Sequence, residues 1–123
     1  MSPAPPKPSA LSTHVLNTAE GRPAEGVVLE LWRMAPGGPL LLCRLVTNAD
    51  GRPEAPLLPP EQFIPGRYEL RFAMGDYFAG RGIGPAERFI DVVTLSVGLA
   101  AGQGHYHVPL LCSPWAYNTY RGS

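Results

Sequence analysis

The sequence predicts an all-β protein, a sandwich of two sheets built from seven or eight short strands. Three observations support this fold class. Apolar residues recur with a period of two in most segments of the chain. Those segments are rich in residues that favour strands. The 15 prolines and 14 glycines are scattered, and they divide the chain into short pieces.

The clearest strand is residues 67–72, where Tyr68, Leu70 and Phe72 alternate with charged residues. This alternation is typical of a half-buried antiparallel strand. Further strands are expected at residues 11–16, 27–34, 40–47, 89–97, 104–113 and 115–120. Turn signals separate them at residues 20–23, 35–39, 48–51 and 64–66. A short helical turn is expected only within residues 75–82.

Residues 1–9 are proline-rich and lack an apolar run, which predicts an extended, disordered N-terminal arm before a single domain at residues 10–123. The arm does not have the apolar region of a secretory signal, so a cytoplasmic location is expected. Ten basic residues balance ten acidic ones, which disfavours nucleic acid and anionic membranes as partners. No apolar run approaches the roughly 18–20 residues that cross a bilayer.

The two cysteines, Cys43 and Cys112, lie in apolar strand-like segments. Their spacing matches no zinc or redox motif. We therefore expect both to be small buried side chains without a chemical role.

The three histidines all lie in predicted strands. Because side chains alternate along a strand, His105 and His107 should point away from the core that Tyr106 and its neighbours at alternate positions form. By the same rule, His14 should lie on the face opposite Leu11 and its apolar neighbours.

Three interpretations fit histidines on an outer strand face. They could be solvated surface residues. His105 and His107 could bind zinc, although the third ligand would then have to be His14 or a carboxylate, and no carboxylate is adjacent to either motif. They could also perform acid–base chemistry, because the unperturbed pKa of imidazole lies near cellular pH.

Two further segments carry candidate residues. The turn at residues 47–52 ends in Arg52, which is either a surface charge or a guanidinium directed at a planar ligand with paired acceptors. The chain closes with Tyr120, Arg121, Gly122 and Ser123 after a run of strand formers. If the last strand pairs inward, these polar groups would be ordered, which would favour a functional role over a frayed tail.

Taken together, three blocks at residues 11–18, 47–52 and 105–123 give the chain a specific resemblance to the 5-hydroxyisourate hydrolases, enzymes of urate breakdown in the transthyretin-like family. The resemblance covers nearly everything after residue 9. The terminal Tyr-Arg-Gly-Ser sequence distinguishes these hydrolases from transthyretin, a hormone carrier.

The resemblance implies a prealbumin-like sandwich of two four-stranded sheets with one short helix. It also implies a homotetramer with active sites at the dimer–dimer interface. The catalytic residues that it implies are His14, Arg52, His107 and Ser123. The substrate-binding residues that it implies are His14, Arg52, Tyr120 and Arg121.

The implied reaction is hydrolysis of the cyclic amide of 5-hydroxyisourate to 2-oxo-4-hydroxy-4-carboxy-5-ureidoimidazoline, with no metal or organic cofactor. We expect His107 to act as general base for water and His14 to orient that water or pass the proton. Arg52 would offset the negative charge that develops on the substrate. The alternative is a transthyretin-like carrier of a small ligand without catalysis, for which a small residue in place of Tyr120 would leave an open channel.

Overall fold

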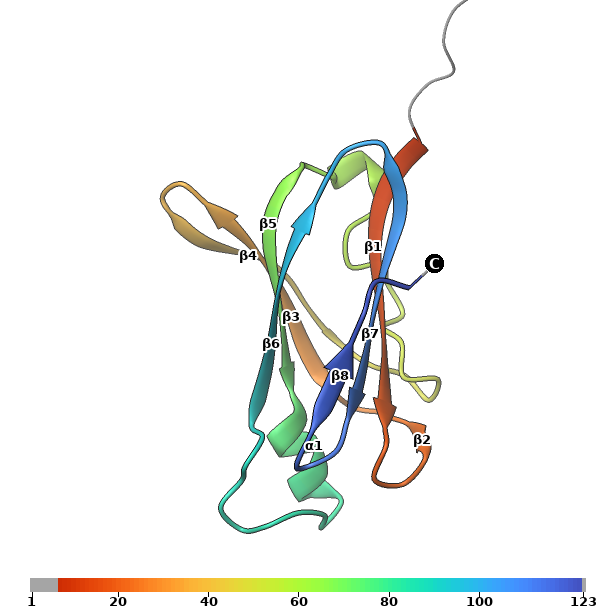
Figure 1. The fold of residues 1–123 in the computed structure, drawn as a ribbon, viewed down its shortest axis with the longest axis vertical. Coiled ribbons are helices and arrows are strands. Elements are labelled where there is room, and N and C mark those ends of the chain that lie inside the picture. Colours follow the sequence, from red (N-terminus) through yellow and green to blue (C-terminus); the bar gives the residue numbers. More distant parts are fainter. Residues whose placement is uncertain (1–6, 123) are drawn as a thin grey trace, which may run out of the picture.

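The computed structural model describes residues 7–122, and their strands form two sheets packed face to face (Figure 1). The described elements, in chain order, are β1 (Lys7–Asn17), β2 (Arg22–Pro23), β3 (Val28–Ala35), β4 (Gly38–Val46), the 3-10 turn η1 (Pro60–Gln62), β5 (Gly66–Ala73), α1 (Met74–Gly80), β6 (Val92–Leu99), β7 (Gln103–Cys112) and β8 (Tyr117–Thr119). This confirms the prediction of two four-stranded sheets with one short helix. Neither described helix is long and apolar enough to cross a membrane.

The first sheet has the order β2-β1-β7-β8 and the second the order β4-β3-β5-β6. The strands pair antiparallel, except that β1 and β7 are parallel. Their register places Ser12 opposite His107 and His14 opposite Pro109. We call the side of this sheet that points away from the second sheet its outer face.

The core lies between the sheets, and its composition follows the alternation seen in the sequence. In β7, Tyr106, Val108 and Leu110 are buried. Of the two histidines that alternate with them, His105 is exposed and His107 is half-buried. In β1, Leu11 and Val15 are fully buried. Burial of each such aliphatic side chain stabilises the fold by about 1.5–3 kcal/mol.

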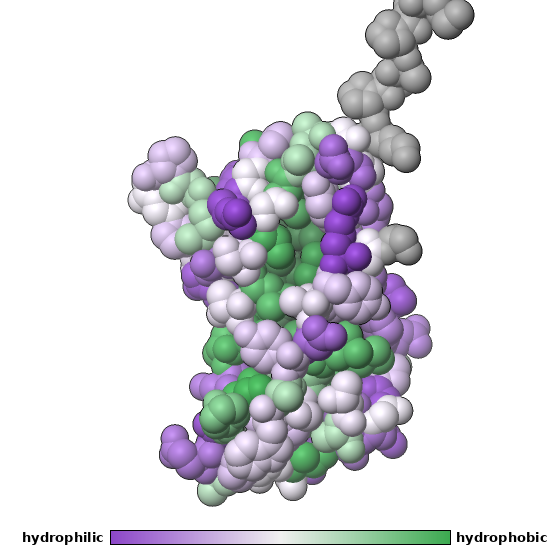
Figure 2. Space-filling view, viewed as in Figure 1, coloured by the Kyte–Doolittle hydropathy of each residue, from purple (hydrophilic) through white to green (hydrophobic). Residues whose placement is uncertain are grey.

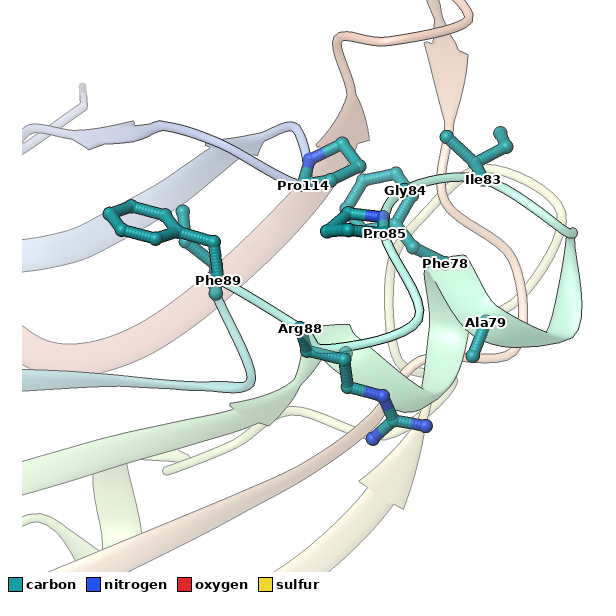
Figure 3. A pocket seen from close by; sticks show the side chains of 10 residues that line it. Phe78, Ala79, Ile83, Gly84, Pro85, Arg88, Phe89 and Pro114 are labelled. Carbon is teal, nitrogen blue, oxygen red and sulfur yellow. The ribbon is translucent and has the colours of Figure 1, made fainter.

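The helix α1 covers one end of the core (Figure 1). Met74, Tyr77 and Phe78, at helical spacing, are its large buried residues. Figure 3 shows Phe78, Ile83 and Pro114 around a small cavity of about 20 Å³ beside the helix. A space of this size holds about one water molecule.

Several boundaries differ from the sequence-based expectation. β1 begins at Lys7 and pairs with Gln103, so the last three residues of the expected arm belong to a strand; residues 1–6 lie outside the described part. The two-residue strand β2 occupies part of a predicted turn. The strand expected at residues 89–97 begins only at Val92, because Phe89 turns outward and stacks on Trp115 at 5.8 Å between ring centroids.

The edges of β6 and β8 do not meet, and an opening of about 330 Å³ lies between the sheets there. Val97, Leu99 and Val108 line it, with Tyr120 and Arg121 at its rim. Figure 2 shows hydrophobic side chains on the floor of this hollow and hydrophilic ones on both sides of it.

Candidate active site

The outer face of β1 and β7 brings together the histidines that the sequence singled out. The ring centroids of His14 and His107 lie 6.5 Å apart, and the ring planes are tilted by 34°. Both side chains are half-buried, while Arg52 in the adjoining turn is exposed. Two imidazoles at this distance leave room for a small molecule to contact both.

A rigid turn holds Arg52 beside the histidines. The side-chain oxygen of Asn48 accepts hydrogen bonds from the backbone N–H groups of Asp50 (2.9 Å) and Arg52 (3.2 Å). This is an Asx-type turn, in which a side chain replaces a backbone acceptor. The Gly51 carbonyl then accepts the backbone N–H of Val15 at 2.8 Å, which ties the turn to β1.

Gly51 is required at this junction for two reasons. Its φ of +77° lies in the left-handed region that residues with a Cβ rarely adopt. An added Cβ would clash with the Val15 carbonyl oxygen and lie 3.3 Å from Cδ2 of His14. The turn can therefore approach β1 this closely only with glycine at position 51.

His107 is held from both of its neighbouring segments. On the β1 side, its Nδ1 lies 2.8 Å from the Ser12 hydroxyl oxygen. On the other side, its carbonyl accepts the backbone N–H of Gly122 at 2.6 Å, because the chain beyond β8 returns to β7. His107 is thus fixed in place by the closing segment as well as by its own sheet.

Ser12 and His105 extend this cluster, although neither is among the catalytic or substrate-binding residues that the resemblance implies. The Ser12 hydroxyl oxygen also lies 2.6 Å from Nε2 of His105, so that it bridges the two histidines of β7. Because side chains alternate along a strand, Ser12 lies on the same face of β1 as His14. Its contact with His107 could not be predicted from the sequence, because it depends on the parallel pairing of β1 with β7, which sets Ser12 opposite His107.

The electrostatic environment favours neutral imidazoles. Burial lowers the pKa of His14 and of His107 below the usual value of 6.5, and the positive charge of Arg52 lowers each further. His14 and His105 act in the same direction on the pKa of His107, whereas the backbone and carboxylate of Asp50 act in the opposite direction on His14. At neutral pH both rings can therefore accept a proton, as a general base must.

The remaining predicted residues have different positions. The exposed fraction of Tyr120 is 58%, and its side chain borders the opening between the sheets. The guanidinium of Arg121 lies over the ring of Tyr106 at 4.2 Å and donates a hydrogen bond to the Gln103 carbonyl at 3.1 Å. Since Tyr106 and its neighbour His107 point to opposite faces of β7, the structure does not bring Arg121 together with the histidines. Ser123 lies outside the described residues.

In the part of the chain that the structure describes, the cysteines form no disulfide and the histidines form no metal site. Cys112 is fully buried and Cys43 half-buried, and both are free thiols. Within residues 7–122, no group of three or more His, Cys, Asp or Glu side chains is arranged to hold a metal ion.

Comparisons with known proteins connect this geometry to a family. The profile of the HIUase/Transthyretin family matches residues 11–122. The chain belongs to this family. It is 50% identical over 115 residues to a 5-hydroxyisourate hydrolase of Halalkalibacterium halodurans, an alignment that covers 92% of this chain and 97% of the relative.

Solved structures agree with the fold. The chain superimposes on the 5-hydroxyisourate hydrolase of Klebsiella pneumoniae with a TM-score of 0.76 and 38% identity, covering 94% of this chain and 99% of that one. It superimposes on sea bream transthyretin in complex with thyroxine with a TM-score of 0.82 and 28% identity, covering 92% and 94% of the two chains. The transthyretin-like sandwich expected from the resemblance is therefore confirmed.

Proposed function

We propose that this protein hydrolyses the cyclic amide of 5-hydroxyisourate to 2-oxo-4-hydroxy-4-carboxy-5-ureidoimidazoline, a step of urate degradation. The observation that carries this proposal is the pair of half-buried imidazoles, 6.5 Å apart, with lowered pKa values beside a guanidinium. The names of the relatives, 5-hydroxyisourate hydrolases among them, support the same substrate.

In the proposed reaction, His107 removes a proton from a water molecule as its oxygen attacks the activated carbonyl carbon of the ring. The carbonyl oxygen gains negative charge, which the guanidinium of Arg52 offsets through charge-assisted hydrogen bonds. The carbon–nitrogen bond of the amide then breaks, and the leaving nitrogen takes up a proton. His14 orients the water or passes this proton, and no metal or organic cofactor takes part.

The closing segment has a lesser part in this proposal. Tyr120 walls the site, and Ser123 with its carboxylate helps to hold the water or the base. Arg121 was expected to bind substrate, but its guanidinium is engaged by Tyr106 and the Gln103 carbonyl. We therefore assign Arg121 to holding the segment that leads to Gly122, which bonds to His107.

We propose that the active protein is a homotetramer with its sites at the dimer–dimer interface. Leu16 and Leu111 share the outer face with the histidines and are only partly buried in one chain, which supports coverage of this face by another copy. Outside the strands, the loops before β6 and between β7 and β8 also expose aromatic side chains, with Phe89 70% and Trp115 60% accessible. A second dimer over the outer face would exclude water and strengthen the charge interactions there.

The test is an absorbance assay of 5-hydroxyisourate that urate oxidase generates in the cuvette, corrected for spontaneous decay. Wild-type protein should accelerate the decay, and His107→Ala and His14→Ala should each lower the turnover by about 10²–10⁴-fold, the usual worth of general acid–base catalysis. Arg52→Ala should also lower turnover, whereas its matched control Arg44→Ala, at an exposed arginine of β4, should not.

Size-exclusion chromatography should show the same assembly for all of these variants. If wild-type protein does not accelerate the decay and instead binds a small apolar ligand, the chain is a carrier and the hydrolase proposal is wrong. Full turnover by either histidine variant would remove that residue from the mechanism.

A further inference from the structure

The hydroxyl of Ser12 makes contacts that the proposed reaction does not use. Its oxygen lies 2.6 Å from Nε2 of His105 and 2.8 Å from Nδ1 of His107. The parallel register of β1 and β7 sets Ser12 opposite His107, so strand pairing brings Ser12 to His105 across 93 residues of sequence and to His107 across 95. Ser12 thus links an exposed histidine, His105, to a half-buried one, His107.

A hydroxyl between two ring nitrogens restricts the tautomers of both rings. Ser12 has one proton to donate, and its oxygen can accept another hydrogen bond. When both rings are neutral and both contacts are hydrogen bonds, at most one of the two nitrogens can accept the single Ser12 proton, so at least one nitrogen donates to the Ser12 oxygen. If Nδ1 of His107 donates, its Nε2 is unprotonated, and Nε2 of His105 either accepts the Ser12 proton or donates to the second lone pair of the Ser12 oxygen.

The position of the proton on His107 decides whether this ring can act as a general base. With the proton on Nδ1, the Nε2 lone pair of His107 is free to take a proton from water. With the arrangement reversed, Nε2 carries the proton and cannot act as a base. In many proteins, a hydrogen bond from a neighbouring residue to one ring nitrogen fixes the tautomer of a catalytic or metal-binding histidine.

We propose that Ser12 and His105 are positioning residues that hold His107 in the tautomer protonated on Nδ1. This inference rests on the proposed function, because it gives His107 its role as base. When Nε2 takes the proton from water, His107 becomes an imidazolium whose Nδ1–H still donates to the Ser12 oxygen, so no bond in the chain needs to reverse. Among the described residues, the charged and titratable groups that act on the pKa of His107 are Arg52, His14 and His105.

The first experiment measures the tautomer directly and needs no substrate. Nitrogen-15 NMR of the imidazoles in the free protein, recorded above the pKa of His107, should show the proton on Nδ1 in the wild type. Ser12→Ala should give a mixture of tautomers or a shift to Nε2, and Ser12→Thr should restore the wild-type signal because threonine keeps the hydroxyl. A wild-type ring protonated on Nε2, or an unchanged tautomer in Ser12→Ala, would overturn the proposal.

The second experiment measures turnover of 5-hydroxyisourate. Ser12→Ala and His105→Phe should lower kcat by about 3- to 10-fold, the worth of one hydrogen bond, with little change in KM, and Ser12→Thr should recover most of the loss. Ser96→Ala, a matched control at an exposed serine of β6, should leave kcat unchanged. Loss in Ser12→Ala that threonine does not recover would show a merely structural role.

The two experiments separate this inference from the proposed function. If the wild-type protein does not hydrolyse 5-hydroxyisourate, the proposed function fails, whereas the NMR spectra still decide whether Ser12 sets the tautomer of His107. Circular dichroism of each variant establishes that the sandwich is folded before either measurement.

Discussion

Gly51 joins the turn that carries Arg52 to the strand that carries His14, and its replacement by alanine should disturb both. The left-handed backbone at this residue would cost an alanine about 1–2 kcal/mol. The added Cβ would also clash with the Val15 carbonyl oxygen, so the turn and β1 must separate by about 1 Å to reach ordinary contact. Such overpacking costs about 1–3 kcal/mol more, and a displacement of about 1 Å at reacting groups can lower the rate about 10²-fold.

Gly82→Ala separates the two effects. Gly82 has a similar φ of +69°, but a Cβ there meets no atom within 4 Å, so this variant should lose only the backbone contribution. Urea unfolding measures stability, and the 5-hydroxyisourate assay measures turnover. We expect Gly51→Ala to be less stable than Gly82→Ala and also much slower, while Gly82→Ala keeps its turnover. Equal stability and equal turnover of the two variants would refute the view that this close approach positions the site.

Four further predictions follow from the charges, the thiols and the proposed chemistry. Arg52→Gln should raise the pKa of His14 and of His107, because it removes a positive charge that lowers both pKa values. NMR titration of the two rings checks this, and unchanged pKa values would show that the guanidinium is too far from the rings to act on them. Because the folded state holds both imidazoles at lowered pKa values, the unfolded chain binds more protons below pH 6.5, so the free energy of unfolding should fall as the pH drops through that value. Burial raises the pKa of the Cys112 thiol to about 11, so iodoacetamide at pH 8 should modify it only after unfolding, as mass spectrometry would show. Turnover should survive treatment with EDTA, and a loss that zinc restores would contradict the metal-free reaction.

The strands and their faces were predictable because they depend on local alternation. Tyr68, Leu70 and Phe72 are all fully buried in β5, as the pattern indicated. The outward orientation of His107 followed from the same rule. Boundaries were less predictable: Phe89 and the two residues after it have strand-like composition but lie outside β6, because the aromatic side chain stacks on Trp115 instead of packing in the sheet.

The assembly of the site was only partly predictable. Nothing in the sequence near Ser12 indicates that its hydroxyl bridges two histidines, since that contact depends on a pairing between distant strands. Arg121 illustrates the opposite difficulty. The family resemblance implied a place beside the histidines, but the guanidinium of Arg121 contacts a flat aromatic surface and a carbonyl acceptor on the other side of β7. Side chains of this length select partners by tertiary contacts that a linear motif does not encode.

The parallel pairing of β1 with β7 has a consequence for synthesis on the ribosome. The second sheet can form early, because β3, β4 and β5 pair antiparallel with strands close to them in the sequence. β1 has to wait until residues 103–112 have emerged, since β7 is the partner along most of its length. Until then the nascent strand has an unsatisfied edge, which is a hazard for aggregation and a potential binding site for chaperones. The face that carries the candidate site is therefore the last part of the fold to be completed, and partly synthesised chains should lack the proposed activity.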